Sequence, residues 1–496
     1  MSTYQEVAQH QHEISLLGST EAVLSWDQET LMPSGAQKHR AEQLGQMTKL
    51  RHALLIEDKH YEQLQSLSAD KQLSAIEQVN IREWLKAAHR ARAIPTELAV
   101  EQTETSSHSM MAWQSARQDN DFKAFAPWLQ KTVSLKLREA EAVGWTDEGE
   151  AWDALADEFD PGMTAQSVSK VFTPLRKELV ALVEELSASS TQPDESFIQQ
   201  KLDIEAQKPL VNEVLKALGF DFNHGVVAVS THPFCSGLHP TDVRVTTRYD
   251  ESNFSDSITS AMHECGHALY EQGLPLELAG TPAGAFNGLS IHESQSRLWE
   301  NQVGRSPGFL QWVMPKYKAA GLQNTDPNKA YSALNVAKPS LIRVEADETT
   351  YNLHVMVRFE LERLMLNGDL AVEDLPEAWN QMYQDYLGVT PPNDAQGCLQ
   401  DVHWSMGAMG YFPTYTLGNL YSAQFYAAAK RDLGDLESLY AKGDFTPLLQ
   451  WLREKIHSKG RQLSPAELCK DVTGEELSAA YLLDYLRNKQ RPLYGL

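Results

Sequence analysis

The spacing of apolar residues predicts helices along most of the chain. Apolar side chains recur every three or four positions, with glutamate, glutamine, lysine and alanine abundant between them, at residues 20–25, 76–91 and 168–186. Breaks containing proline or glycine fall at residues 32–35, 94–95, 160–162 and 191–193. Because no fixed-period repeat and no long low-complexity linker divides these helices, we expect an all-α fold in a single domain over residues 1–496.

The pattern changes near residue 225. Val226-Val-Ala-Val229 is rich in β-branched residues, and residues 243–248 begin with alternating apolar and polar side chains. A segment containing glycine and proline, residues 231–240, separates the two. We therefore expect a small antiparallel hairpin. Its edge would either hold an extended peptide by main-chain hydrogen bonds or only cap a helical bundle.

This change divides the expected domain into three consecutive parts. A helical N-terminal part extends to about residue 220, and a helical C-terminal part covers about residues 421–496. The central part, about residues 221–420, contains the hairpin and the motifs that carry chemistry.

The helix expected after the hairpin covers residues 256–273. Its apolar residues Ile258, Met262, Cys265 and Leu269 recur at helical spacing, with Asp256 as the expected cap and a glycine at the end.

This helix contains the motif H-E-x-x-H. His263 and His267 are four residues apart, so their rings project from one face, about 40° apart around the helix axis. Two imidazoles at this spacing can bind a zinc ion, and Glu264 is placed to take a proton from a water molecule. The alternative is an amphipathic surface helix with two solvated histidines.

A catalytic zinc ion needs a third protein ligand, with the fourth position left to water. A second helix is expected at residues 290–304, and Glu293 in its first turn is our choice. Two alternatives remain open at this point. Ser290 and Glu293 also have the spacing of a capping box, and the neighbouring His292 could be the ligand instead.

Two further segments contain candidate substrate-binding groups. One long helix is expected over residues 339–366. Within it, Arg343 and Asp347 would form a surface ion pair. Alternatively, Arg343 would bind a substrate carboxylate and Asp347 would orient a histidine ligand. Further on, His403, Tyr411 and Tyr415 lie in a glycine-rich segment. These three residues could donate hydrogen bonds to an oxyanion, or they could be aromatic packing near a turn.

Composition limits the partners. The chain has 43 lysine and arginine residues against 67 acidic ones, a net charge of −24, which argues against binding to nucleic acid or to an anionic membrane. The four cysteines are too few and scattered for a disulfide framework, so free thiols in a reducing compartment are expected. The first residues do not resemble a secretory signal, and no apolar run is long enough to span a membrane. We therefore expect a cytoplasmic protein.

Six motifs occur in an order that resembles the carboxypeptidase Taq family of metallocarboxypeptidases. They are His232-Pro-Phe, Asp242-x-Arg-x-Thr, His263-Glu-x-x-His, His292-Glu-Ser-Gln, Ile342-Arg-x-x-Ala-Asp and Gly397-x-x-Gln-Asp-x-His-Trp. The resemblance covers the full chain, from the early Trp26-Asp-x-Glu to the late Gly410-Tyr-Phe-Pro. Six motifs in order are far more specific than H-E-x-x-H alone.

The resemblance implies an almost all-helical fold with a long substrate cleft, related in outline to the angiotensin-converting enzyme and neurolysin type of zinc peptidase. It implies a cytoplasmic homodimer that removes single residues from peptide C-termini with broad specificity. It also implies Glu293 as the third zinc ligand, with His403 and either Tyr411 or Tyr415 stabilising the tetrahedral intermediate. One zinc ion per chain is expected, with cobalt as an alternative metal.

An exopeptidase must also recognise a free carboxylate, for which a bidentate arginine is best suited. Arg343 and Arg244 are the candidates, and His232 is expected to narrow the cleft. Two other classes of function remain: a zinc oligoendopeptidase with a similar helical cleft, and a non-enzymatic helical binding protein.

Overall fold

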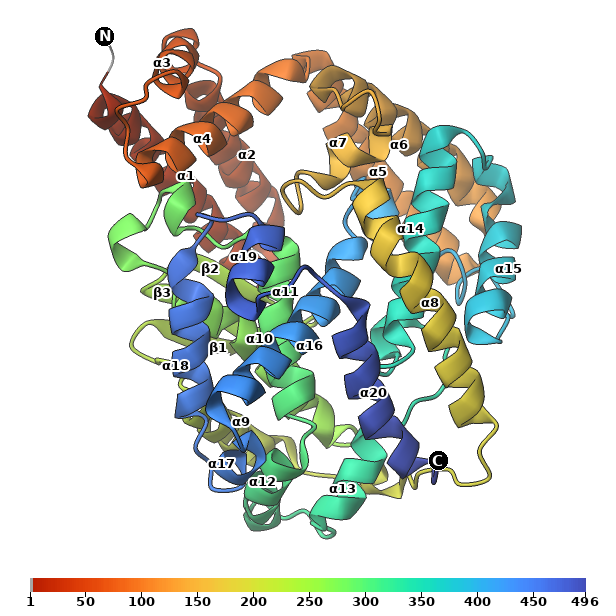
Figure 1. Ribbon diagram of the computed structural model, residues 1–496. Helices are drawn as coiled ribbons and strands as arrows, with labels where there is room; N and C mark the ends of the chain where they lie inside the picture. The colour runs from red at the N-terminus through yellow and green to blue at the C-terminus, as the bar shows by residue number, and fades with distance from the viewer. Residues whose placement is uncertain (1–2) are drawn as a thin grey trace. The chain divides into compact units, whose positions relative to one another are not determined.

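A computed structural model describes residues 3–496, and its elements are helices apart from three short strands (Figure 1). The residues fall into two compact units, each assembled from three segments of the chain. The first unit contains the residues up to Arg92, Asp194–Leu334 and Tyr421–Glu476. The second contains Ala93–Pro193, Asn335–Leu420 and Leu477–Leu496. No helix among residues 3–496 is long and apolar enough to cross a membrane.

The first unit begins with four helices. A capping box formed by Thr3 and Glu6 starts the first helix. Apolar residues of three of these helices, including Val7, Leu64 and Trp84, form a common core. The predicted break at residues 32–35 is confirmed, because a short 3₁₀ turn separates the first two helices there. The four helices are α1 (Tyr4–Thr30), α2 (Gln37–Leu55), α3 (Asp58–Ser68) and α4 (Ala75–Ala93).

A three-stranded sheet follows helix α9 (Ile204–Leu218). Its strands are β1 (Gly225–Val229), β2 (Cys235–His239) and β3 (Asp242–Thr247), in the order β1-β3-β2. The prediction of a hairpin between the first and last of these was wrong, because β1 and β3 pair in parallel. The predicted loop contains β2, which pairs with β3 in the antiparallel sense. The residues of β2 lack β-branched side chains, so the sequence did not mark it as a strand.

Helix α10 (Phe254–Glu271) packs on the sheet and against α11 (Gly288–Arg297), and Figure 1 shows these helices in green beside the strands. The predicted cap at Asp256 was wrong by one turn. The helix starts after Asn253, and Asp256 lies within its first turn. A π-helical turn, Leu298–Val303, continues α11.

The other helices of the first unit follow the sheet region and close the unit near its C-terminal end. They are α12 (Pro307–Ala319), α13 (Pro327–Leu334), α17 (Leu436–Tyr440), α18 (Thr446–Lys455) and α19 (Pro465–Thr473). Helix α16 (Pro413–Leu433) begins in the second unit and ends in the first.

The second unit packs its helices around a buried carboxylate. Glu362 accepts hydrogen bonds from the indole N–H groups of Trp152 at 3.1 Å and Trp404 at 2.8 Å, and from the Gly410 amide at 3.0 Å. This satisfies a carboxylate that would otherwise be costly to bury. The helices of this unit are α5 (Thr96–Asp119), α6 (Phe122–Val143), α7 (Ala151–Ala156), α8 (Ala165–Ser187), α14 (Tyr351–Asn367), α15 (Leu375–Leu387) and α20 (Ala479–Leu493).

The single long helix predicted over residues 339–366 was also wrong. The chain forms only a 3₁₀ turn, Arg343–Glu345, before α14 begins at Tyr351. Asp347 explains the interruption, because its carboxylate accepts hydrogen bonds from the backbone amides of Lys338, Thr349 and Thr350. These bonds hold the chain in a turn where apolar spacing alone indicates a helix.

Close packing of α10 on α11 depends on Gly266, which lies between the two histidines of the motif. A Cβ atom at this position would lie 2.6 Å from the Gln295 carbonyl oxygen and 2.6 Å from the Ser296 Cα atom. Both neighbours are backbone atoms, so relief requires the two helices to separate.

We therefore expect Gly266→Ala to lower the free energy of unfolding by about 1–3 kcal/mol, as overpacked sites usually do. Thermal unfolding and the metal content after dialysis would measure the effect. The control is Gly45→Ala in the exposed helix α2, where nothing lies within 4 Å of the new methyl group. That variant should be neutral or more stable by up to about 1 kcal/mol. Equal stabilities for the two variants would contradict the packing argument.

Candidate active site

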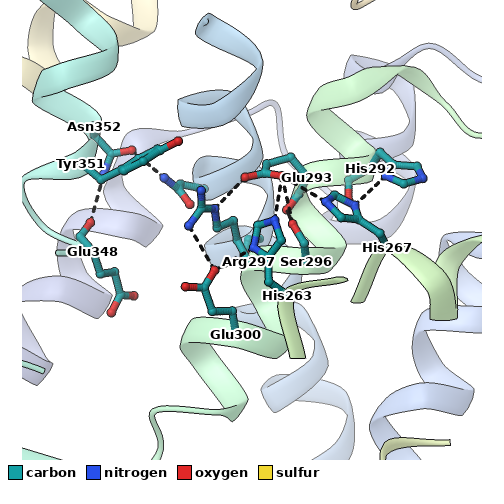
Figure 2. Close-up of polar contacts among 12 residues, drawn as sticks. His263, His267, His292, Glu293, Ser296, Arg297, Glu300, Glu348, Tyr351 and Asn352 are labelled. Carbon is teal, nitrogen blue, oxygen red and sulfur yellow. Dashed lines mark hydrogen bonds and ion pairs between the residues drawn. The ribbon is translucent and has the colours of Figure 1, made fainter. Parts of the chain in front are cut away.

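Three side chains from two helices converge in the first unit. His263 and His267 project from α10, and Glu293 projects from α11 towards them (Figure 2). One ligand atom from each lies within 4.8 Å of the other two. The Glu293 Oε2 atom lies 3.7 Å from His263 Nε2 and 3.4 Å from His267 Nε2. All three side chains are largely buried.

The far side of each imidazole ring has a hydrogen-bond acceptor. His263 Nδ1 lies 2.8 Å from the Glu300 carboxylate, and His267 Nδ1 lies 3.1 Å from the His292 carbonyl oxygen. An Nδ1–H group that donates to such an acceptor fixes the neutral tautomer, which leaves the Nε2 lone pair for a metal ion. Both Nε2 atoms face Glu293, so the two rings are oriented as metal ligands require.

The Glu293 carboxylate is held by its own helix. Arg297 Nε donates to Oε1 at 2.6 Å, and the Ser296 hydroxyl donates to Oε2 at 3.0 Å. The capping-box alternative for Glu293 was wrong, because α11 starts at Gly288 and Ser290 lies inside the helix.

These residues fit a tetrahedral divalent ion. Ligand atoms about 2.1 Å from such an ion are about 3.4 Å apart, close to the separations between Glu293 and the two imidazoles. Two imidazoles and a carboxylate form a recurrent set for catalytic zinc. The rival ligand His292 points elsewhere, since its Nε2 lies 2.9 Å from Glu271 and its Nδ1 faces His267 Nδ1 at 2.6 Å.

The pKa values of the ligands reflect two opposing effects, burial and charge. Burial opposes protonation of His263, but Glu293 and Glu300 outweigh it and raise its pKa to about 8. Burial and the neighbouring His292 lower the pKa of His267 to about 3. Burial also disfavours the ionised form of Glu293, yet Arg297 and the two imidazoles hold its pKa well below the usual value. Protons therefore compete with a metal ion mainly at His263.

Glu264 differs from the other carboxylates of the site. It is 7% exposed, and no hydrogen bond or ion pair to residues 3–496 holds its carboxylate. Burial raises its pKa to about 7, and the nearby Glu293 and Glu300 contribute in the same direction, although His263 opposes them. A carboxylate with this pKa can accept and return a proton near neutral pH, as a general base must.

In the second unit, Arg343 is buried and anchored. Its Nε and Nη2 atoms donate to one oxygen of Asp401 at 3.1 and 2.7 Å, and its Nη1 donates to the Tyr351 hydroxyl at 3.0 Å. The second Asp401 oxygen accepts from Arg358 Nε at 2.6 Å. The alternative of a surface pair between Arg343 and Asp347 was wrong, because the turn at residue 347 removes the helical spacing on which it depended.

His403 and the two candidate tyrosines lie together within the same unit. The ring centres of His403 and Tyr411 are 5.4 Å apart, and those of Tyr411 and Tyr415 are 5.3 Å apart. The Arg343 guanidinium lies 5.2 Å from the centre of the Tyr415 ring. Burial lowers the pKa of His403 to about 4, against the opposing charge of Asp401. His403 is therefore a neutral hydrogen-bond donor at neutral pH.

Arg244, the other arginine candidate, lies on β3 in the first unit. Its Nε and Nη2 atoms donate to both oxygens of Asp242, each at 2.8 Å, and its guanidinium lies 4.9 Å from the centre of the Trp26 ring. The side chain is 21% exposed, more than the 5% of Arg343. His232 is exposed in the segment before β2.

Sequence reasoning missed several residues that hold the site. Glu300 and Arg297 follow Glu293 by seven and four positions, so their helical spacing could have placed them on one face with it. Asp401 belongs to the motif Gly397-x-x-Gln-Asp-x-His-Trp, but nothing in the sequence shows that it pairs with two distant arginines.

Comparisons with known proteins agree on one family. A family model described as carboxypeptidase Taq (M32) metallopeptidase matches residues 6–490. Thermostable carboxypeptidase 1 of Thermus thermophilus is 42% identical over 506 residues, covering 100% of this chain and 99% of the relative. Carboxypeptidase 1 of Bacillus subtilis is 40% identical, covering 97% of each chain.

Solved structures give the same result. The M32 carboxypeptidase from Deinococcus radiodurans has a TM-score of 0.95 at 40% identity, with 99% of each chain covered. The Pyrococcus furiosus carboxypeptidase has a TM-score of 0.96 at 36% identity, again with 99% of each chain covered. The mainly helical fold class predicted from the sequence is thereby confirmed.

The contact between Glu300 and His263 leads to a prediction about metal affinity. We expect Glu300→Gln to weaken binding of Zn²⁺ about 10- to 100-fold, because it removes the carboxylate that orients and polarises the imidazole. Competition with a chromogenic chelator at fixed pH would measure this. Glu277→Gln, which changes an exposed glutamate of the same unit, is the control and should bind Zn²⁺ as the unmodified chain does. An unchanged affinity in Glu300→Gln would exclude the orienting role.

Proposed function

The chain belongs to the carboxypeptidase Taq (M32) family of metallopeptidases, and from this premise we propose that it is a zinc-dependent carboxypeptidase. It releases single amino acids from the C-termini of peptides with broad specificity. The observation that carries the proposal is the convergence of two imidazole Nε2 atoms and the Glu293 carboxylate beside the buried Glu264.

In this proposal, His263, His267 and Glu293 hold the zinc ion. A bound zinc ion supplies a Lewis acid that lowers the pKa of water and polarises the scissile carbonyl group. Glu264 takes the proton from the attacking water and then passes it to the leaving amine. Its raised pKa and its lack of a fixed hydrogen bond support this role.

Stabilisation of the tetrahedral oxyanion is assigned to His403 with Tyr411 or Tyr415. A neutral imidazole N–H and a phenolic O–H are both suitable donors to a developing negative charge. The contacts among these rings within the second unit support a common role.

Recognition of the free carboxylate is assigned to Arg343 or Arg244. Each is already paired with an aspartate, which fixes the guanidinium in one orientation. Of its five N–H donors, Arg343 uses three in hydrogen bonds to Asp401 and Tyr351. Arg244 uses two of its five in hydrogen bonds to Asp242. The remaining N–H donors allow either side chain to bind a second carboxylate. His232 is assigned to narrow the substrate cleft.

The backbone of the substrate peptide is assigned to the free edge of strand β2. Because Phe234 and Ser236 face β3 in hydrogen-bonded positions, the antiparallel register places the N–H and C=O groups of Cys235 and Gly237 on the free edge of β2. An extended peptide can pair with such an edge and gain affinity from main-chain hydrogen bonds. The proposal also includes a homodimer in the cytoplasm, as the family resemblance implies.

The role of Glu264 gives the most direct test. We expect Glu264→Gln to lower kcat about 10²- to 10⁴-fold while the chain still binds one Zn²⁺, because only the proton acceptor is lost. Mass spectrometry of an N-blocked peptide, incubated with and without chelator, reports the cut position and the metal dependence together.

Three outcomes would contradict part or all of the proposal. Wild-type turnover in Glu264→Gln would exclude it as the base. Internal cleavage of C-terminally amidated peptides would select an oligoendopeptidase. Failure to retain about one metal ion per chain, without chelator-sensitive hydrolysis, would select a non-enzymatic binding protein.

The arginine candidates are tested in parallel. We expect the alanine variant of the carboxylate-binding arginine to lower kcat/KM about 10- to 100-fold for peptides with a free C-terminus, because a charge-assisted hydrogen bond is lost. Its preference for free acids over amides should disappear, and its zinc content should stay intact. Unchanged kcat/KM in both Arg343→Ala and Arg244→Ala would remove both candidates.

A further inference from the structure

A cavity of about 690 Å³ lies within the first unit, on the side of β2 that faces α1. Residues of α1 and α4 form one wall, and the end of β2 with the loop at residues 279–286 forms the other. This volume is in the range of sites that bind small molecules or short peptide segments.

The cavity begins one helical turn beyond the candidate metal ligand His267. Glu271, on the same helix, lines the cavity and binds the His292 ring at 2.9 Å. Its side chain packs directly against β2, because a Cβ atom at Gly237 would lie 2.3 Å from Glu271 Cδ. The cavity and the candidate metal site are therefore neighbours on α10.

Strand β2 extends from the candidate metal site to the cavity. The strand packs against α10, the helix that carries Glu264 and Glu271. At the start of the strand, burial together with the charges of Glu271 and Glu264 raises the pKa of the Cys235 thiol. At its end, Gly237 and His239 line the cavity. A peptide that pairs with this edge and has its C-terminal bond near Glu264 therefore has its upstream residues in the cavity. Its chain direction is antiparallel to β2.

The lining is suited to apolar side chains. The larger apolar residues of the lining are Leu16, Val23, Trp84, Leu238, Leu274 and Phe286. The acidic residues of the lining are already engaged. Asp242 pairs with Arg244 at 2.8 Å, Glu271 with His292 at 2.9 Å, and Glu83 with Arg82 at 2.8 Å. Arg461, the cation of the lining, donates to the Phe286 carbonyl oxygen at 3.0 Å.

We propose that this cavity binds apolar side chains upstream of the released residue, and that Leu16 and Leu238 determine this specificity. The proposal rests on the proposed function of the neighbouring site and adds to it a substrate class: peptides with an apolar residue at the second, third or fourth position from the C-terminus. Leu16 supports this, because it is 53% exposed and lines the cavity, so it offers an apolar surface that a bound side chain would cover.

The test compares N-blocked alanine peptides with leucine or glutamine at the second, third or fourth position from the C-terminus. Binding is measured by calorimetry on the zinc-loaded Glu264→Gln chain, in which turnover is suppressed. We expect leucine to bind about tenfold more tightly than glutamine at one or more of these positions, because one buried leucine side chain contributes roughly that factor. Adding Leu16→Gln and Leu238→Gln should remove most of this preference.

The matched control adds Leu31→Gln and Leu276→Gln, which change two exposed leucines outside the cavity, and it should keep the preference. Equal affinities for leucine and glutamine at every position, or the same preference after the cavity substitutions, would overturn the proposal.

Kinetics of the unmodified chain separate this proposal from the proposed function. C-terminal release with no upstream preference in kcat/KM would overturn the cavity assignment and leave the carboxypeptidase function intact. A binding preference without C-terminal release would support the cavity and overturn the function. With both proposals correct, the preference should appear mainly in KM.

Discussion

The contact between α10 and α11 at Gly266 is the constraint on which the candidate site depends. Two histidines on one helix define only a face; the third ligand must come from another helix at a fixed distance and rotation. The missing side chain at Gly266 lets the backbone of α11 lie against α10 between the two histidines. That approach brings Glu293 Oε2 to 3.4 Å from His267 Nε2. Larger residues would separate the helices before they affected any ligand directly.

The close packing of α10 and α11 also buries negative charge, which Arg297 of α11 partly neutralises. Glu293 and Glu300 bring two buried carboxylates to the site, and Arg297 pairs with both of them, at 2.6 and 3.1 Å. An incomplete set of buried charges is strongly destabilising, so these residues act as a unit and not as separate contacts. The remaining negative charge raises the pKa of His263 to about 8. A divalent cation at the candidate site would compensate that charge better than a single proton.

Sequence periodicity predicted what depends on local spacing. Helix α10, its two histidines and Glu264, and the helix that carries Glu293 were all predicted from the spacing of residues within one segment of the chain. Prediction failed where distant residues decide the local structure. Strand β2 forms from residues without β preference because β3 pairs with it, and Asp347 stops a helix that the apolar pattern continues. The partners of Arg343 could not be predicted either, because Asp401 follows 58 positions later.

Under the proposed function, the anchoring of Arg343 bears on how the enzyme would select the ends of peptide chains. An arginine on an exposed, mobile loop would bind any carboxylate, including side chains of the substrate. Asp401 instead holds Arg343 against the rings of Phe412 and Tyr415, at 5.3 and 5.2 Å. Its remaining donors therefore point in fixed directions, and a carboxylate must arrive at one position to use them. Arg244 is fixed in the same manner by Asp242. Whichever arginine acts, position and not charge alone would distinguish a C-terminus from an acidic side chain, which leaves the side chains themselves free to vary.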